Sequence, residues 1–204
     1  MSGGDGERPA GSICAIARAP GFLDCEKVAG TSRGLGVNTI APKLDARLAL
    51  LSISEETKTH VAALTPVLSA ELDPILRRFY RHIRGFPEGQ ALIPDDEMEK
   101  SLRARQRAHW LRLFSCRFDD DYVASALAVG RAHLRAGVAP YIYIAGYNFI
   151  LCELIKAVVV HHAGALNVSG LLTAMTRVVY LDMDLALSTY TRELWRAQGF
   201  ARRR

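Results

Sequence analysis

Helical periodicity dominates the chain from Leu44 to Gln198 and restricts what the chain can fold into. Apolar residues in this stretch recur at intervals of three and four positions, which places them on one face of each helix. No segment of the stretch alternates apolar and polar residues as a half-buried strand does, and no hairpin dipeptide occurs in it. The sequence therefore predicts an all-α fold in which roughly six to eight helices pack around one core.

Capping residues and helix breakers divide this stretch into separate helices. Ser52 or Ser54, followed by Glu55 and Glu56, is typical of a helix start, as are the aspartates at 95–96 and 119–121. Glycine or proline after a periodic run indicates a helix end. The expected helices cover about residues 54–70, 72–84, 95–115, 119–137, 140–162 and 169–198.

The sequence predicts one folded domain between two tails. Residues 1–43 are rich in Gly, Ser, Ala and Pro and show no sustained period, so we expect a disordered N-terminal tail. The folded domain is expected to cover residues 44–198, where helical periodicity continues throughout. Residues 199–204 are expected to form a basic C-terminal tail, which ends in three arginines.

Charge and hydropathy argue against several classes of partner. The formal net charge is +5, but the basic residues form no stripe interleaved with aromatics, so nucleic-acid binding is not expected. The longest apolar run, near residues 144–160, is interrupted by Asn148, Glu153 and Lys156, so we expect no membrane span. The N-terminus lacks the continuous apolar core of a signal peptide, which favours a cytoplasmic protein.

His133 is the residue whose surroundings point most directly to a ligand. At helical spacing its face carries Ala126, Val129 and Gly130, which would leave room for a large flat group beside the imidazole. Haem is the expected group, because a neutral imidazole nitrogen is a good axial ligand for iron. From helical spacing alone, a core histidine whose ring nitrogens are satisfied within the protein remains the more common arrangement.

Four stretches of the chain, taken together and in order, match one known family. They are Phe79-Tyr80, Gln106–Ser115 with the following Arg117–Val123, Gly130–Pro140, and Leu181–Leu187. Through these stretches, the chain from about Leu44 to Trp195 resembles the globin domain of globin-coupled sensors, bacterial haem proteins that detect oxygen. The resemblance implies a sensor-type globin fold built around a haem pocket.

The resemblance also implies roles for individual residues. His133 takes the place of the proximal ligand to the iron of haem b, and its second ring nitrogen needs an acceptor such as a backbone carbonyl. Tyr80 takes the place of the distal tyrosine, whose hydroxyl donates a hydrogen bond to oxygen. Leu102 falls where a distal side chain limits access to the iron, and Tyr143 falls where an aromatic residue approaches the haem. Val129 shares the face of His133 and is expected to contact the cofactor.

We therefore expect a gas sensor that binds O2 reversibly at ferrous haem, with CO and NO as further ligands. The helices expected at 140–162 and 169–198 are long and largely apolar, so they are expected to form a homodimer as a four-helix bundle and to carry the signal. The sequence leaves the downstream signalling partner open. Since no cyclase signature and no transducer segment follows Trp195, we expect a stand-alone or truncated sensor without enzymatic activity.

Two other functions are compatible with the same residues. A globin that turns over nitric oxide or peroxide would need an electron supply, and the chain has no flavin or nicotinamide motif. A haem-free interaction module would use the globin-like fold alone. His109 competes with His133 as the iron ligand, because it shares an apolar stripe with Leu102 and Leu113, but it fits helix packing better.

Zinc sites and paired-carboxylate catalysis are not expected. The four cysteines form no CxxC pair and lie at no spacing typical of a zinc site. Asp182 and Asp184 lie two positions apart on one expected helix, so they cannot both face one site.

Overall fold

The protein folds into seven helices within the part of the chain that the structure describes. The computed structural model describes the backbone of residues 44–197 and the side chains as far as Thr191. The helices are α1 (Leu44–Leu50), α2 (Glu55–Ile83), α3 (Pro87–Leu92), α4 (Asp96–Phe114), α5 (Asp120–Arg135), α6 (Pro140–His161) and α7 (Val168–Ala197). The expected all-α architecture is confirmed, whereas the two predicted tails lie outside the described residues.

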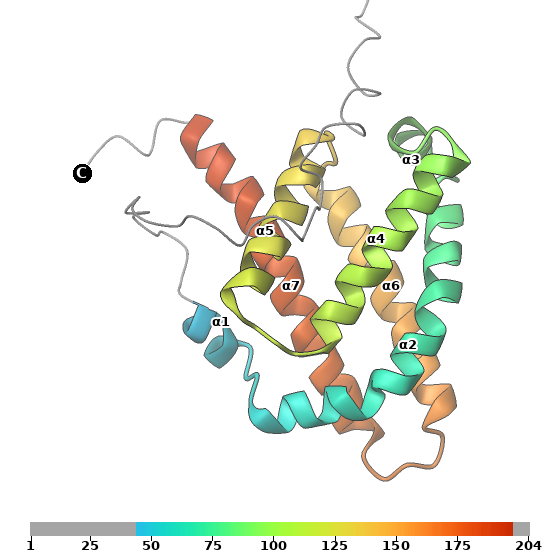
Figure 1. Cartoon of the computed structure of the whole chain (residues 1–204), viewed down its shortest axis with the longest axis vertical. Coiled ribbons are helices and arrows are strands. Elements are labelled where there is room, and N and C mark those ends of the chain that lie inside the picture. Colours follow the sequence, from blue (N-terminus) through green and yellow to red (C-terminus); the bar gives the residue numbers. More distant parts are fainter. Residues whose placement is uncertain (1–43, 198–204) are drawn as a thin grey trace, which may run out of the picture.

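The helices form two layers that cross one another (Figure 1). α5 packs mainly against α7, and α4 packs mainly against α2, while α6 packs against both α2 and α7. In Figure 1, α4 and α5 lie on the side nearer the viewer, and α6 and α7 run behind them. The helix that carries His133 is therefore supported from behind by α7.

α2 is one continuous helix of 29 residues, and the predicted break near residue 71 is wrong. Pro66 and Pro74 both lie inside it. An internal proline lacks an N–H and displaces the carbonyl four residues earlier, which bends a helix without ending it when packing holds both halves. Leu68, Leu72 and Leu76 are fully buried on both sides of the expected break, so tertiary packing carries the helix through it. Figure 1 shows α2 changing direction before it runs alongside α6.

Three predicted helix starts are confirmed by side-chain caps. Ser54, one of the two serines considered, forms a capping box with Thr57. Asp95 accepts a hydrogen bond from the Met98 N–H at 2.7 Å. Asp119 accepts one from the Tyr122 N–H at 2.8 Å. The short helix α3 was not predicted. It begins at Pro87, a residue type that suits the first position of a helix because that position needs no N–H donor.

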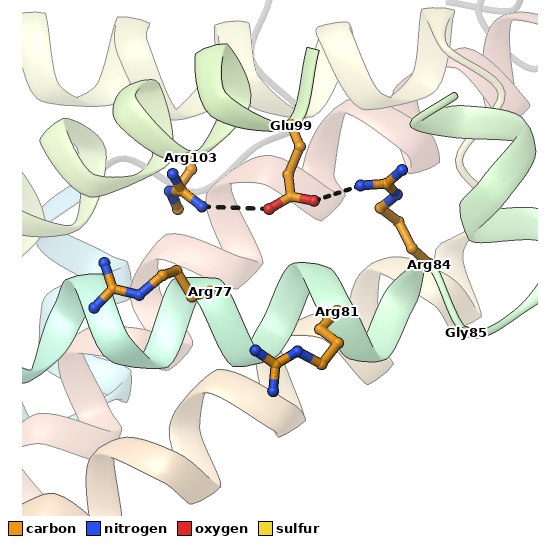
Figure 2. A pocket seen from close by; sticks show the side chains of 6 residues that line it. All are labelled: Arg77, Arg81, Arg84, Gly85, Glu99 and Arg103. Carbon is orange, nitrogen blue, oxygen red and sulfur yellow. Dashed lines mark hydrogen bonds and ion pairs between the residues drawn. The ribbon is translucent and has the colours of Figure 1, made fainter. Parts of the chain in front are cut away.

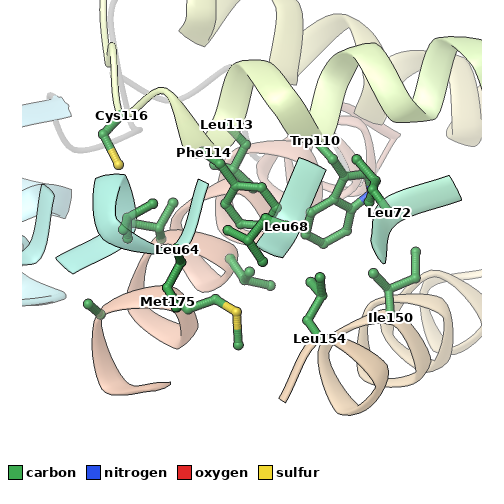
Figure 3. Close-up of a cluster of buried hydrophobic side chains, with 14 of the residues drawn as sticks. Leu64, Leu68, Leu72, Trp110, Leu113, Phe114, Cys116, Ile150, Leu154 and Met175 are labelled. Atoms are coloured by element: carbon green, nitrogen blue, oxygen red, sulfur yellow. The ribbon is translucent and has the colours of Figure 1, made fainter. Parts of the chain in front are cut away.

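A leucine-rich core joins α2, α4, α6 and α7 (Figure 3). Its labelled members are nearly all at most 3% exposed: Leu64, Leu68 and Leu72 from α2, Trp110, Leu113 and Phe114 from α4, Ile150 and Leu154 from α6, and Met175 from α7. Each such burial stabilises the fold by roughly 1.5–3 kcal/mol. α5 contributes Tyr122 and Ala126 to this cluster, with Val123 packed against it, all near the start of the helix, so His133 lies beyond the edge of the cluster.

Gly130 of α5 lies in close contact with the backbone of α7. A Cβ atom added there would lie 2.3 Å from the carbonyl oxygen of Ala186 and 2.7 Å from the Thr189 hydroxyl oxygen. The expectation that Gly130 leaves space for a flat group beside His133 is therefore wrong. Its missing side chain allows the two helix backbones to touch, and α5 is fixed against α7 as a result.

α6 combines a buried stripe with an exposed apolar face. Its buried residues recur at helical spacing: Tyr143, Gly146, Ile150, Leu154 and Val158. Tyr141, Ile144, Val159 and Val160 are exposed. By length and composition alone α6 could cross a membrane, a test that core helices of soluble proteins also pass. The expectation of no membrane span relied on Asn148, Glu153 and Lys156. These three residues do not prevent α6 from passing the test of length and composition.

Candidate functional site

The imidazole of His133 has one nitrogen engaged and one free within the described protein. Nδ1 lies 2.9 Å from the carbonyl oxygen of Val129, one turn earlier in α5, and donates a hydrogen bond to it. Burial, opposed by this bond, lowers the pKa of His133 below its ordinary value. The ring is therefore neutral, with its Nε2 lone pair available, which is the form that ligates a metal. Val129 supplies the carbonyl acceptor whose identity the sequence left open.

The backbone around His133 is held by a helix-ending turn. Gly137 has a φ of 75°, a conformation that glycine adopts without strain. The Val138 N–H donates to the His133 carbonyl at 3.0 Å, and the Gly137 N–H donates to the Leu134 carbonyl at 3.1 Å, which together form a Schellman motif. The hydroxyl of Tyr190 in α7 donates to the Val138 carbonyl at 3.1 Å. α7 thus fixes the turn that follows His133.

Tyr143, which the resemblance places near the haem, lies directly beside His133. The two ring centroids are 4.9 Å apart and the rings are inclined by 76°, an edge-to-face contact. Tyr143 is buried, and its hydroxyl donates to the Tyr147 hydroxyl at 3.1 Å. Burial, followed by the charge of Asp182, raises the pKa of Tyr143 far above its ordinary value.

Tyr80 is a buried phenol, and no hydrogen bond joins its hydroxyl to any of the described residues. Its ring packs edge-on against that of Phe79 at 5.1 Å. Burial, followed by the charge of Glu99 in α4, raises the pKa of Tyr80 well above its ordinary value. The hydroxyl therefore keeps its proton and remains a donor for a further partner.

α4 brings a second set of polar atoms to the face that carries Leu102. Leu102 is part-buried, and Gln106 and His109 follow it at helical spacing. The Gln106 side-chain oxygen and the His109 Nδ1 atom are both buried without a hydrogen-bond partner among the described residues. The charge of His109 on α4 contributes to the lowered pKa of His133 on α5, after burial. Sequence analysis treated Gln106 only as part of a motif.

Asp182 forms a polar cluster that sequence analysis missed. Its carboxylate, 1% exposed, accepts hydrogen bonds from His109 Nε2 at 2.8 Å, from the Tyr122 hydroxyl at 2.6 Å and from the Tyr147 hydroxyl at 2.5 Å. Burial opposes ionisation, but His109 and the tyrosine donors outweigh it and lower the pKa of Asp182. Asp184 faces elsewhere and pairs with buried Arg47 of α1, which confirms that the two aspartates do not share a site.

A charged cavity of about 480 Å³ lies between α2 and α4 (Figure 2). It is lined by Arg77, Arg81, Arg84, Gly85, Glu99 and Arg103. Glu99 bridges Arg84 at 2.8 Å and Arg103 at 3.3 Å. The lining contains no histidine, so this cavity does not provide the iron ligand. It provides the carboxylate whose charge helps to keep Tyr80 protonated.

The donors on the described residues fit haem better than a bare metal ion. No group of three or more His, Cys, Asp or Glu side chains within residues 44–191 could hold a metal ion alone. Haem brings four nitrogens of its own and needs only one axial ligand from the protein, which a single free imidazole nitrogen supplies. Tyr80, Gln106 and His109 offer polar atoms that still lack partners among the described residues.

Comparison with solved structures places the fold. The globin domain of the Geobacter sulfurreducens globin-coupled sensor matches with a TM-score of 0.69 at 16% identity, covering 74% of this chain and 99% of that domain. The ferrous globin domain of E. coli DosC matches with a TM-score of 0.58 at 17% identity, covering 72% and 97%. At such low identity these matches show the fold alone, and they confirm the predicted sensor-type globin fold.

Comparison with sequences places the family. The heme-based aerotactic transducer HemAT of Halobacterium salinarum is 26% identical over 154 residues, which are 71% of this chain and 32% of the transducer. The chain thus spans about a third of that relative's length. The Protoglobin family model matches residues 41–196, which is well over half of the chain. The chain therefore belongs to the Protoglobin family and resembles the globin domains of globin-coupled sensors.

Proposed function

We propose that this protein binds haem b through His133 and senses a diatomic gas, with O2 as the expected signal. The observation that carries the proposal is the state of the His133 ring: Nδ1 is fixed by the Val129 carbonyl, and the neutral Nε2 is left to bind. Membership of the Protoglobin family and the similarity to a transducer named as heme-based support the choice of cofactor.

Each site residue has a distinct task in this proposal. Haem, when bound, would supply an iron that can bind a gas. His133 would provide the protein's nitrogen ligand to that iron, and Tyr143 packs against the His133 ring. Leu102 and Val129 supply apolar walls that limit the size of the distal and proximal spaces. Since CO acquires less charge than O2, a hydroxyl donor at Tyr80 favours O2 over CO.

The strength of the Tyr80 hydrogen bond sets the expected rate of oxygen release. A hydrogen bond from a buried hydroxyl to a partner with charge is worth about 1.5–3 kcal/mol. That energy corresponds to roughly tenfold to hundredfold slower release. The absence of a protein partner for the Tyr80 hydroxyl among the described residues leaves its proton available for this bond.

The signal is proposed to leave the site through α6 and α7 of a homodimer. Exposed apolar side chains on these helices supply a surface that a second copy would cover: Tyr141, Ile144, Val159, Val160 and Tyr180. Two arrangements of the paired helices with different oxygen affinities would couple binding to output. A cytoplasmic location is part of the same proposal.

Titration of the purified protein with haemin tests the proposal. The wild type is expected to bind one haem per chain and to develop a strong Soret band. His133→Ala is expected to lose most of that band, whereas His161→Ala, at an exposed histidine of α6, should retain it. Equal binding by all three proteins would contradict the proposal. A wild type that binds no haem would favour a haem-free interaction module.

A further inference from the structure

Asp182 is a buried carboxylate to which the proposed function assigns no task. A charge removed from water is strongly destabilising unless donors replace its hydration. Three side chains from three different helices do so here: His109 of α4, Tyr122 of α5 and Tyr147 of α6. Asp182 itself lies on α7, so one carboxylate joins four helices of the fold.

The two tyrosine donors differ in the contacts that they make beyond Asp182. Tyr122 ends its branch, because its hydroxyl donates to Asp182 and makes no further hydrogen bond to the residues that the structure describes. Tyr147 continues its branch, because its hydroxyl also accepts from the Tyr143 hydroxyl at 3.1 Å. The Tyr143 ring then meets the ring of His133 at 4.9 Å. One branch of the cluster thus reaches the candidate iron ligand.

The direction of the hydrogen bonds gives this branch its strength. Tyr147 donates to the charged oxygen of Asp182, and a donor polarised in this way becomes a better acceptor for the next hydroxyl. The Tyr143 hydroxyl donates to the Tyr147 hydroxyl, and this bond holds the hydroxyl end of the Tyr143 side chain. A ring fixed at its hydroxyl and buried around its body rotates less freely than one held by packing alone.

The imidazole of His133 is restrained from two sides as a result. The Val129 carbonyl accepts a hydrogen bond from Nδ1, which sets the tautomer of the ring and restrains its in-plane orientation. Tyr143 meets the imidazole at 76°, which opposes rotation of the ring plane. The orientation of an imidazole influences its bond to a metal, so a restraint on the ring plane would act on the bond that His133 forms when haem is bound.

We propose that Asp182 is a positioning residue for the axial imidazole, and that it acts on His133 through Tyr147 and Tyr143. The proposal rests on the proposed haem function. It assigns to α7 a route to His133 that consists of two hydrogen bonds and one ring contact, separate from the link between the Tyr190 hydroxyl and the Val138 carbonyl.

Two tyrosine variants separate positioning from plain stability. Tyr147→Phe and Tyr122→Phe each remove one hydrogen bond to Asp182, and the two bonds are nearly equal in length, at 2.5 and 2.6 Å. Only Tyr147→Phe cuts the route to His133. Urea unfolding of the apoprotein is expected to show a loss of stability in both variants. The iron–imidazole stretching band of the ferrous haem protein, measured by resonance Raman scattering, is expected to shift or broaden in Tyr147→Phe and to match the wild type in Tyr122→Phe.

Two further variants complete the experiment. Tyr143→Phe keeps the ring beside His133 and removes its hydroxyl, so it should reproduce the altered band of Tyr147→Phe. Asp182→Asn should alter the band at least as much. If Asp182→Asn does not fold, the tyrosine variants decide the question by themselves.

The possible failures are distinguishable. A wild type that takes up no haem removes the proposed function, and the positioning role of Asp182 with it. A wild type with a normal band, together with Tyr147→Phe and Tyr122→Phe bands that are both unchanged or equally shifted, overturns the positioning role and leaves haem binding intact.

Discussion

Gly130 of α5 lies so close to Ala186 of α7 that a Cβ atom on Gly130 would be 2.3 Å from the Ala186 carbonyl oxygen. The helix that carries His133 is therefore set directly against the helix that carries Asp182. A movement of either helix must be accommodated by the other, since the contact is between backbones that cannot rotate away.

Gly130→Ala is expected to destabilise the protein by about 1–3 kcal/mol, because the added methyl group overlaps backbone atoms and forces α5 away from α7. Urea unfolding of the apoprotein measures the loss. Ala124→Ser, at an exposed position of the same helix, is the matched control and should change stability little. A Gly130→Ala variant as stable as the control would show that the two helices are not in backbone contact.

Tyr80→Phe is expected to bind haem as the wild type does and to release O2 roughly tenfold to hundredfold faster, because the hydrogen-bond donor is lost. Stopped-flow measurement of O2 dissociation checks this, with CO dissociation as an internal comparison that should change less. An unchanged O2 dissociation rate would remove Tyr80 from the site and would leave the assignment of His133 untouched.

The pair formed by His109 and Asp182 predicts a pH dependence of stability. Burial lowers the pKa of His109, but Asp182 more than offsets it and the pKa ends above the ordinary 6.5. A raised folded-state pKa contributes stability below pH 6.5, and that stability is lost as pH rises through the raised value. The lowered pKa of Asp182 contributes stability above its ordinary 3.8, and that stability is lost as pH falls through the lowered value.

The stability of the wild-type apoprotein relative to His109→Gln should therefore be greatest between about pH 4 and pH 6.5 and should shrink as pH rises further. Urea unfolding at several pH values measures this difference. The lowered pKa of His133 acts in the opposite sense near pH 6.5, and most of this effect cancels because burial, its main cause, is the same in both proteins. A difference that is constant with pH would mean that His109 and Asp182 are not an ion pair.

The exposed apolar face of α6 predicts a self-association that charge should abolish. Ile144 and Val159, 47% and 45% exposed, lie on that face. Ile144→Glu and Val159→Glu are each expected to convert a dimer into a monomer, since a buried unpaired carboxylate opposes association. Analytical ultracentrifugation measures the state, with Ala124→Glu on α5 as the control. A wild type that is monomeric at all concentrations would contradict the proposed dimer.

Local signals in the sequence predicted most of the fold. Asp95 and Asp119 each fix a helix start through a hydrogen bond to the N–H three residues later, so their role follows from neighbouring residues alone. Near Pro74 the local signal was misleading, because burial of Leu72 and Leu76 against other helices outweighed the cost of the proline. Tertiary packing of this kind leaves no mark within a short window of sequence.

The candidate site also combines contacts between residues close in the sequence, which can be predicted, and contacts between distant residues, which cannot. The bond from His133 to Val129 spans four residues and is within reach of sequence reasoning, although only its general type was predicted. The bonds of Asp182 to Tyr147, Tyr122 and His109 span 35, 60 and 73 residues. They depend on how four helices cross, and a single sequence carries no direct signal of that crossing. An aspartate on the apolar stripe of a long helix was the one indication available.

Chemical rescue of His133→Gly tests the central claim most directly. The variant removes the proposed axial ligand and leaves space where free imidazole can bind. Haem-loaded His133→Gly is expected to lose the absorption spectrum of the wild type and to regain it when millimolar imidazole is added. A variant that keeps the wild-type spectrum without imidazole would show that another group binds the iron, and the assignment of His133 would be wrong.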